Sequence, residues 1–149
     1  MRKMPSGKMA DERLNEQLTN SGFRFTPQRQ QVYSVLMKTL DHPTAEQVFM
    51  RCKQAMPDIS MATVYNCLDA LVTSQLVRAV HVHREATRYC PNMNDHVHFY
   101  CDGCGGVFDI ELGANGGKAR FPLPVGFQAS QYDVSIRGAC PNCAGKKRK

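Results

Sequence analysis

The sequence predicts an α+β protein in which a helical N-terminal part precedes a smaller part made of short strands. Apolar residues recur at helical spacing, between good capping residues, from residue 11 to about residue 75. Short segments of strand length follow, and both Cys-x-x-Cys pairs and most glycines fall after residue 90. We therefore expect two domains within the 149 residues, at 10–90 and 93–149.

The first two helices have clear ends. Leu14 and Leu18 lie on one face of a helix expected from Ala10 to Ser21, and Gly22 stops it. The second helix begins after Thr26, a natural N-cap, with a proline at the first helical position, where the missing N–H costs nothing.

The third and fourth helices also begin at capping residues. Residues 44–47, Thr-Ala-Glu-Gln, form a capping-box pattern that opens the third helix, and Pro57 separates it from the fourth. Ser60 caps the fourth helix, whose predicted buried stripe is Val64, Leu68 and Leu71.

Two short strands are expected after these helices, at 76–82 and 86–90, with a turn near residues 83–85. Three helices that lead into a capped fourth and then a β-hairpin resemble a winged helix-turn-helix. A generic small helical domain remains the alternative at this point.

The second half is expected to form strands at 97–100, 107–112 and 132–137. Residues 113–124 are rich in Gly and Pro and lack a helical period, so we expect a loop or an extended connection there.

Composition limits the class of protein. The hydrophobic fraction of 42% allows a packed core, and no apolar run approaches the roughly 20 residues of a membrane span. An odd count of seven cysteines without a secretory signal favours the reducing cytoplasm, where Cys-x-x-Cys pairs indicate metal sites. The net charge of +6 points weakly to nucleic acid, and part of it comes from the basic tail at 146–149.

The four paired cysteines, Cys101, Cys104, Cys140 and Cys143, predict a structural zinc site. Four thiolates fill a tetrahedron and leave no open position for a substrate. Two disulfides or an iron–sulfur cluster are the alternatives, but the spacing and the expected compartment favour Zn²⁺.

A second metal site is indicated by His96 and His98, which project to the same side of a strand, whereas Cys101 has the opposite parity. Asp109 lies on the next predicted strand, Cys90 lies just before the domain boundary, and His42 could reach in from the helical half. A site built from both halves would couple metal occupancy to their arrangement.

Each of these residues has a simpler interpretation. A lone histidine such as His42 is more often a cap or a surface residue, and Cys90 could be a small buried hydrophobe. His81 and His83 form a His-x-His on the expected wing, without accompanying ligands, and are expected to be exposed. We expect Cys52 and Cys67 to be core thiols.

Six ordered motifs give the chain a resemblance to the ferric uptake regulator (Fur) family of bacterial metal-dependent repressors, over about residues 10 to 145. The motifs are RFTPQR at 24–29, HPTA at 42–45, ATVYN at 62–66, RY at 88–89, DHVH at 95–98 with CDGCG at 101–105, and GACPNC at 138–143.

The resemblance implies an N-terminal winged helix-turn-helix DNA-binding domain followed by a small α/β dimerisation domain, working as a homodimer on palindromic operators. It implies Zn²⁺ in the four-cysteine site and a regulatory divalent metal bound by His42, Cys90, His96, His98 and Asp109. Within the fourth helix, Tyr65 and Asn66 would face the major groove of double-stranded DNA, and Arg24 would reach the minor groove or the backbone.

The regulatory metal is not fixed by the resemblance. Zinc-uptake regulators of the family place a Cys at the position of Cys90, where iron and peroxide sensors carry a carboxylate. His42 and the TVYN motif at 63–66 instead resemble the peroxide-sensing branch. A thiolate favours Zn²⁺ over Fe²⁺ or Mn²⁺, so zinc sensing is favoured, with an iron or peroxide sensor as the alternative. The residues around 131–132 lack the His of a further site, so no third site is expected.

Two other classes of protein remain as alternatives. A metal-dependent enzyme would use His96, His98 and Asp109 to hold a catalytic ion, but no Glu is clearly placed as acid or base and no HExxH motif occurs. A zinc-stapled binding or storage module would lack DNA contacts. We therefore expect a regulator and not an enzyme.

Overall fold

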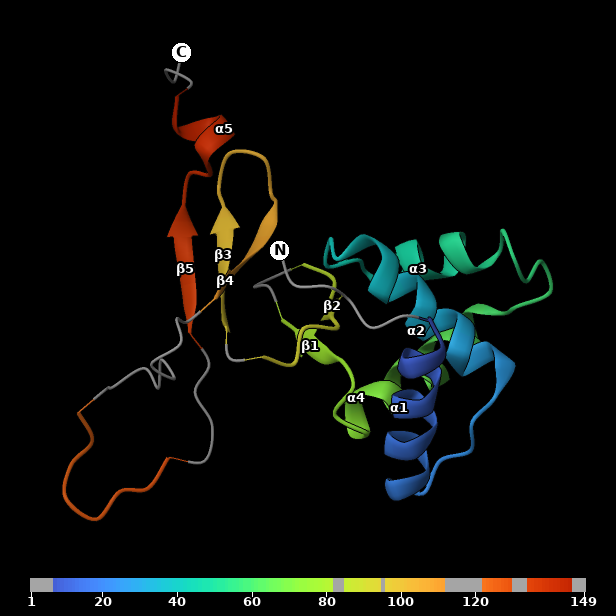
Figure 1. Cartoon of the computed structure of the whole chain (residues 1–149). Helices are drawn as coiled ribbons and strands as arrows, with labels where there is room; N and C mark the ends of the chain where they lie inside the picture. The colour runs from blue at the N-terminus through green and yellow to red at the C-terminus, as the bar shows by residue number, and fades with distance from the viewer. Residues whose placement is uncertain (1–6, 82–84, 95, 112–121, 130–133, 146–149) are drawn as a thin grey trace. The chain divides into compact units, whose positions relative to one another are not determined.

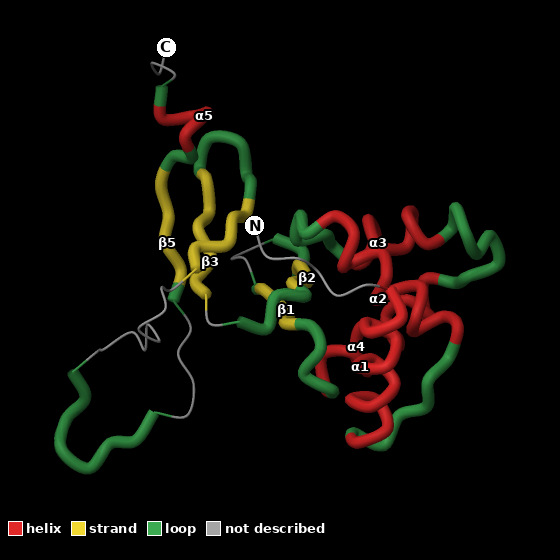
Figure 2. The backbone as a smooth tube through the Cα atoms, in the orientation of Figure 1, coloured by secondary structure: helices red, strands yellow, loops and turns green. Residues whose placement is uncertain are grey.

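Helices occupy the first half of the chain and strands dominate the second in the computed structural model (Figures 1 and 2). The structure describes residues 7–81, 85–94, 96–111, 122–129 and 134–145. None of the helices in these ranges is both long and apolar enough to cross a membrane. Two compact units divide the chain, Met1–Met93 and Asn94–Lys149.

The second, third and fourth helices of the first unit begin at the predicted caps, and the first begins at Gly7, three residues before its expected start at Ala10. Thr26 accepts a hydrogen bond from the Arg29 N–H over 3.2 Å, and Ser60 accepts one from the Thr63 N–H over 3.1 Å. At the third helix, Thr44 and Gln47 exchange both bonds of a capping box, at 3.3 and 3.0 Å. The helices are α1 (Gly7–Asn20), α2 (Pro27–Thr39), α3 (Ala45–Cys52) and α4 (Met61–Thr73).

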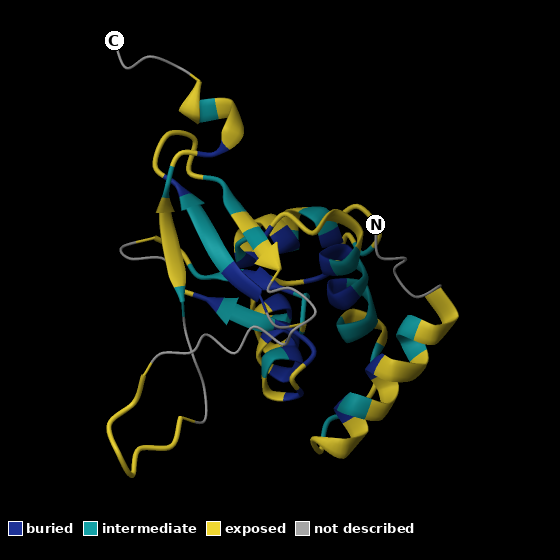
Figure 3. Cartoon of the chain, turned by 60° about the vertical axis from the view of Figure 1, so that its left-hand side comes forward, coloured by how far each residue is buried: buried dark blue, intermediate teal, exposed yellow. Residues whose placement is uncertain are grey.

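One face of each helix contributes buried side chains to the core of the first unit, drawn in dark blue in Figure 3. Leu14, Leu36, Val48 and Leu68 have no exposed surface, and each comes from a different helix. Cys52 also lies in this core, where burial, with a smaller effect of Cys67, raises its pKa to about 11. A thiol that stays protonated is unreactive. Cys52 and Cys67 are both buried, which confirms the prediction that they are core cysteines.

A short antiparallel hairpin follows α4, made of β1 (Arg78–Val80) and β2 (Arg88–Cys90). Both strands are shorter than predicted. Leu76 is buried and donates its N–H to the Leu71 carbonyl, so it closes the end of α4 and does not join the ladder. The expected turn at 83–85 lies largely outside the described residues. Four helices and this hairpin confirm a winged-helix arrangement over a purely helical domain.

The second unit contains a three-stranded sheet in the order β4–β3–β5. Its strands are β3 (His96–Cys101), β4 (Val107–Glu111) and β5 (Ser135–Gly138), close to the predicted positions. β3 pairs antiparallel with β4 and parallel with β5. A single helical turn, α5 (Pro141–Ala144), follows β5 and was not predicted. Most of the expected 113–124 connection and residues 131–133 lie outside the described residues.

Loss of the capping box should weaken α3. Replacing Thr44 with Ala removes the acceptor for the Gln47 N–H, so we expect a loss of about 1 kcal/mol in the free energy of unfolding. Urea unfolding followed by far-UV circular dichroism measures this loss. Thr73→Ala is the matched control, because Thr73 is exposed near the end of α4; equal midpoints for the two variants would contradict the assigned role of the cap.

Candidate metal centres and nucleic-acid interface

His96, His98 and Asp109 converge on one face of the sheet in the second unit. His98 stands opposite Asp109 in the β3–β4 register, and their side chains approach to 3.3 Å. The Nε2 atoms of the two histidines are 3.0 Å apart, and His96 Nε2 is 3.4 Å from Asp109. The side chain of His96 has no exposed surface. Strand alternation thus brings together three of the five predicted regulatory ligands.

The orientation of His96 is fixed by the backbone. Its Nδ1 is 2.6 Å from the carbonyl oxygen of Asn94. A carbonyl can only accept a hydrogen bond, so Nδ1 donates to it, and in the neutral ring the Nε2 lone pair then faces His98 and Asp109. Such an outer partner is what orients histidine ligands of metals.

The spacing of these three groups suits one divalent ion. Nitrogen and oxygen ligands at about 2.1 Å from a metal lie about 3.0–3.4 Å apart, depending on its geometry. The three measured separations fall in this range. Two imidazoles and a carboxylate accept Zn²⁺, Fe²⁺ or Mn²⁺, so these donors alone do not select among those ions.

His42 and Cys90 lie together within the first unit. One ring nitrogen of His42 and the Cys90 sulfur are within 4.8 Å of each other, and the two residues are 3% and 1% exposed. An isolated β-bridge between Thr44 and Arg88 explains this proximity, and next to it the Tyr89 N–H donates to the Pro43 carbonyl over 2.9 Å. His42 is therefore not the surface residue of the simpler interpretation.

The two Cys-x-x-Cys pairs meet at one end of the sheet. β3 and β5 run parallel with Cys101 opposite Gly138, so the turns that follow both strands emerge side by side, as Figure 1 shows for β3, β5 and α5. Cys104 follows in the first turn, while Cys140 and Cys143 flank and occupy the short α5. Residues about 40 positions apart thereby share one site.

The geometry of this four-cysteine group fits zinc. The four sulfurs lie within 4.8 Å of one another, and no disulfide joins any of these four described cysteines. Sulfurs at about 2.3 Å from one tetrahedral zinc are about 3.8 Å apart, and Cys104 and Cys140 are separated by 3.9 Å. The Cys140 N–H donates to the Cys101 sulfur over 3.3 Å, and such backbone bonds lower the pKa of Cys101 to about 6. A ready thiolate favours metal binding.

Gly103 is a steric requirement of the same site. A Cβ atom placed there would lie 3.0 Å from both Cβ and Sγ of Cys143. Any side chain at Gly103 would therefore force the Cys143 side chain, which carries one of the four sulfurs, to move.

The predicted DNA-contact residues are accessible. Tyr65 is 46% exposed, and Asn66 is exposed beside it on the face of α4 opposite the core. Arg24 is exposed in the segment before α2, where its carbonyl accepts a hydrogen bond from the Arg29 side chain over 2.6 Å. His81 is exposed, as expected, with its Nδ1 3.2 Å from the Thr87 hydroxyl, and His83 lies outside the described residues.

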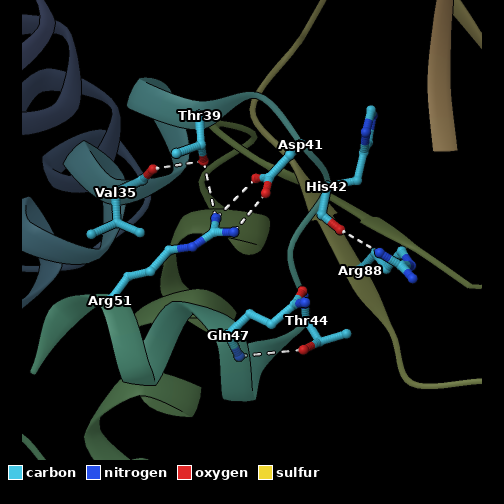
Figure 4. Close-up of polar contacts among 8 residues, drawn as sticks. All are labelled: Val35, Thr39, Asp41, His42, Thr44, Gln47, Arg51 and Arg88. Atoms are coloured by element: carbon cyan, nitrogen blue, oxygen red, sulfur yellow. Dashed lines mark hydrogen bonds and ion pairs between the residues drawn. The ribbon is translucent and has the colours of Figure 1, made fainter. Parts of the chain in front are cut away.

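The loop that carries His42 has polar partners that the sequence analysis missed (Figure 4). The Arg51 guanidinium binds both carboxylate oxygens of Asp41, at 2.9 and 2.5 Å, and this bond holds the pKa of Asp41 down at about 2. Arg88 donates to the His42 carbonyl over 3.2 Å. In the sequence, Arg88 stands out only as part of the RY motif at 88–89, which does not predict its bond to the His42 carbonyl. No periodic pattern in the sequence links Asp41 to Arg51.

Comparison with known proteins gives consistent matches. The sequence model of the ferric uptake regulator family matches residues 20–132. The peroxide operon regulator of Bacillus subtilis is 31% identical over 133 residues, which cover 89% of this chain and 92% of that protein. The peroxide-responsive repressor PerR of Staphylococcus aureus is 28% identical over 130 residues, covering 87% and 88%.

Solved structures share the fold. The Helicobacter pylori ferric uptake regulator, described as having three functional metal-binding sites, aligns with a TM-score of 0.75 at 20% identity, over 99% of this chain and 100% of that one. The Campylobacter jejuni peroxide stress regulator aligns with a TM-score of 0.64 at 25% identity, over 94% and 100%.

Substitution of Gly103 by Ala should weaken the four-cysteine site. The added methyl group collides with Cys143, so we expect zinc to be held about tenfold less tightly, as for other changes beside metal ligands. Chelator competition measures zinc retention. Gly145→Ala is the control, because its Cβ would meet nothing within 4 Å. If Gly103→Ala holds zinc as tightly as this control, the steric argument is wrong.

Proposed function

Because this chain belongs to the ferric uptake regulator family, we propose that it is a metal-responsive transcriptional repressor that binds palindromic operators as a homodimer when its regulatory site is metallated. The match of the family model over residues 20–132 carries this proposal, because it spans parts of both units. Residues 10–90 are the proposed DNA-binding domain and residues 93–149 the proposed dimerisation domain.

DNA recognition is assigned to α4 and the segment before α2. A recognition helix places its exposed side chains in the major groove, which suits Tyr65 and Asn66. Arg24 supplies a charge for the minor groove or a phosphate. The N-terminus of α4 adds backbone N–H groups that favour a phosphate.

A homodimer is supported by the second face of the sheet. Phe99, Phe108 and Ile136 occupy paired positions across β4, β3 and β5, on the face opposite His98. Phe108 and Ile136 are 41% and 42% exposed, as is Ile110 at 42%. Adjacent exposed apolar side chains of this kind mark an interaction surface.

Two metal centres with separate tasks are proposed. Zn²⁺ in Cys101, Cys104, Cys140 and Cys143 stabilises the dimerisation domain. The regulatory ion takes His96, His98 and Asp109 from one domain, with His42 and Cys90 from the other. Binding by groups from both domains would make their arrangement depend on the metal.

Zinc is the regulatory ion that Cys90 supports, because thiolates favour Zn²⁺ over Fe²⁺ or Mn²⁺. The peroxide-responsive relatives support the second candidate, an iron- or manganese-dependent peroxide sensor. In either case we propose a cytoplasmic protein that acts as a regulator and not as an enzyme, and the relatives' names, regulator and repressor, support the regulatory role.

Metal titration with DNA tests the repressor proposal and the effector together. A duplex is first selected from a random pool by metal-loaded protein. We expect protein with only its structural zinc to bind this duplex at least tenfold more weakly than protein given a second ion, with Zn²⁺ more effective than Fe²⁺ or Mn²⁺. The measurement is fluorescence anisotropy under anaerobic conditions.

Equal affinity with and without the second ion would rule out metal-dependent repression. Cys90→Asp separates the two effectors, because a carboxylate should shift the preference towards Fe²⁺ or Mn²⁺. An unchanged order of metals in Cys90→Asp would show that thiolate softness does not set the preference.

The proposed dimer surface is tested by adding one charge to it. Ile136→Glu places a carboxylate among apolar side chains, so we expect monomers at concentrations where the wild type is dimeric. Sedimentation velocity measures the state. Ser135→Glu adds the same charge to the other face of β5 and should remain dimeric. A dimeric Ile136→Glu protein would place the interface elsewhere.

A further inference from the structure

The loop between α2 and α3 holds His42 in an unusual backbone conformation. Leu40 and His42 have φ angles of 49° and 55°, in the left-handed region that residues with a Cβ rarely adopt. Leu40 is the left-handed C-cap of α2 and donates its N–H to the Leu36 carbonyl, so the helix end accounts for its conformation, whereas His42 lies beyond that cap. Such conformations persist only when surrounding contacts fix them, and they gather at functional sites.

Side-chain contacts fix this loop on both sides of the His42 Cα atom. Before it, Arg51 binds both oxygens of Asp41 and the Thr39 hydroxyl, the latter over 3.0 Å. After it, the Arg88 guanidinium binds the His42 carbonyl. Figure 4 shows the Asp41 and His42 side chains leaving the loop in different directions.

Arg51 connects the loop to a rigid part of the unit. It lies in the last turn of α3, between Val48 and Cys52, both fully buried in the core. Fixing the Asp41 side chain and the His42 carbonyl restrains the backbone on each side of His42. The direction of its Cα–Cβ bond, and so the position of the imidazole, follows from those two restraints.

We propose that the Asp41–Arg51 ion pair is a positioning element for metal binding, which holds His42 in its left-handed conformation with the imidazole ready for the ion. This inference rests on the proposed role of His42 as a regulatory ligand. Neither Asp41 nor Arg51 touches the metal, so both act through His42.

The exposure of the pair agrees with a local role. The side chains of Arg51 and Asp41 are 31% and 45% exposed, and ion pairs in such surroundings add little to overall stability. The bidentate geometry nevertheless restricts orientation strongly, because two parallel hydrogen bonds fix the carboxylate plane. The pair therefore contributes more to the geometry of the loop than to the stability of the fold.

The test is a double-mutant cycle on the full chain with its structural zinc retained. Zn²⁺ is titrated into Asp41→Asn, His42→Ala and the double variant, in competition with a chromophoric chelator. We expect Asp41→Asn to raise the dissociation constant of the second zinc about tenfold, the size typical of groups that orient ligands. In the His42→Ala background the same change should have no further effect, because its target is gone. Asp58→Asn, an exposed Asp in the same unit, is the control.

The outcomes separate the two levels of the proposal. Unchanged zinc affinity in His42→Ala would overturn the ligand assignment of the proposed function, and the positioning role with it. Weakened binding in His42→Ala with wild-type binding in Asp41→Asn would overturn the positioning role alone. Additive losses in the double variant would also overturn it, because a general loss of structure acts independently of His42. Arg51→Gln should reproduce the Asp41→Asn result.

Discussion

The pairing of β3 with both of its neighbours is the constraint on which the second unit depends. The antiparallel register with β4 sets Asp109 opposite His98, and the parallel register with β5 brings the two Cys-x-x-Cys turns to one end of the sheet. The same alternation leaves the apolar side chains on the other face. A shift of one residue in either register would exchange the faces and separate the ligand groups.

In the first unit, a polar loop with a strained backbone is held against a helical core. Capped helices with fully buried faces provide a rigid frame. The loop at residues 40–43 then departs from ordinary backbone geometry and is held by charged side chains from α3 and β2. His42 is buried although it lies in a loop, which is the combination expected of a positioned ligand and not of a simple connection.

The two sets of candidate metal donors differ in chemistry as well as in place. Four thiolates make a closed, soft site that stabilises structure and excludes exchange with a substrate. Imidazole and carboxylate donors make a harder site, and the metal ion that it prefers depends on which further ligands complete the coordination shell. In the proposed regulatory site, Cys90 adds a thiolate to donors that are otherwise imidazoles and a carboxylate. Family membership alone therefore does not specify which metal ion is the effector, and metal titration has to identify it.

The sequence by itself determined the capped starts of α2, α3 and α4 and the family, and it predicted which residues would bind metal. Caps depend on residues within four positions of each other, and the Cys-x-x-Cys and His-x-His spacings are equally local. Only the tertiary structure revealed the Asp41–Arg51 pair, the left-handed backbone at His42, the short length of the wing strands and the parallel register of β3 with β5. These features depend on segments distant in the chain, whose pairing is set by packing and chain closure, and no local pattern encodes them.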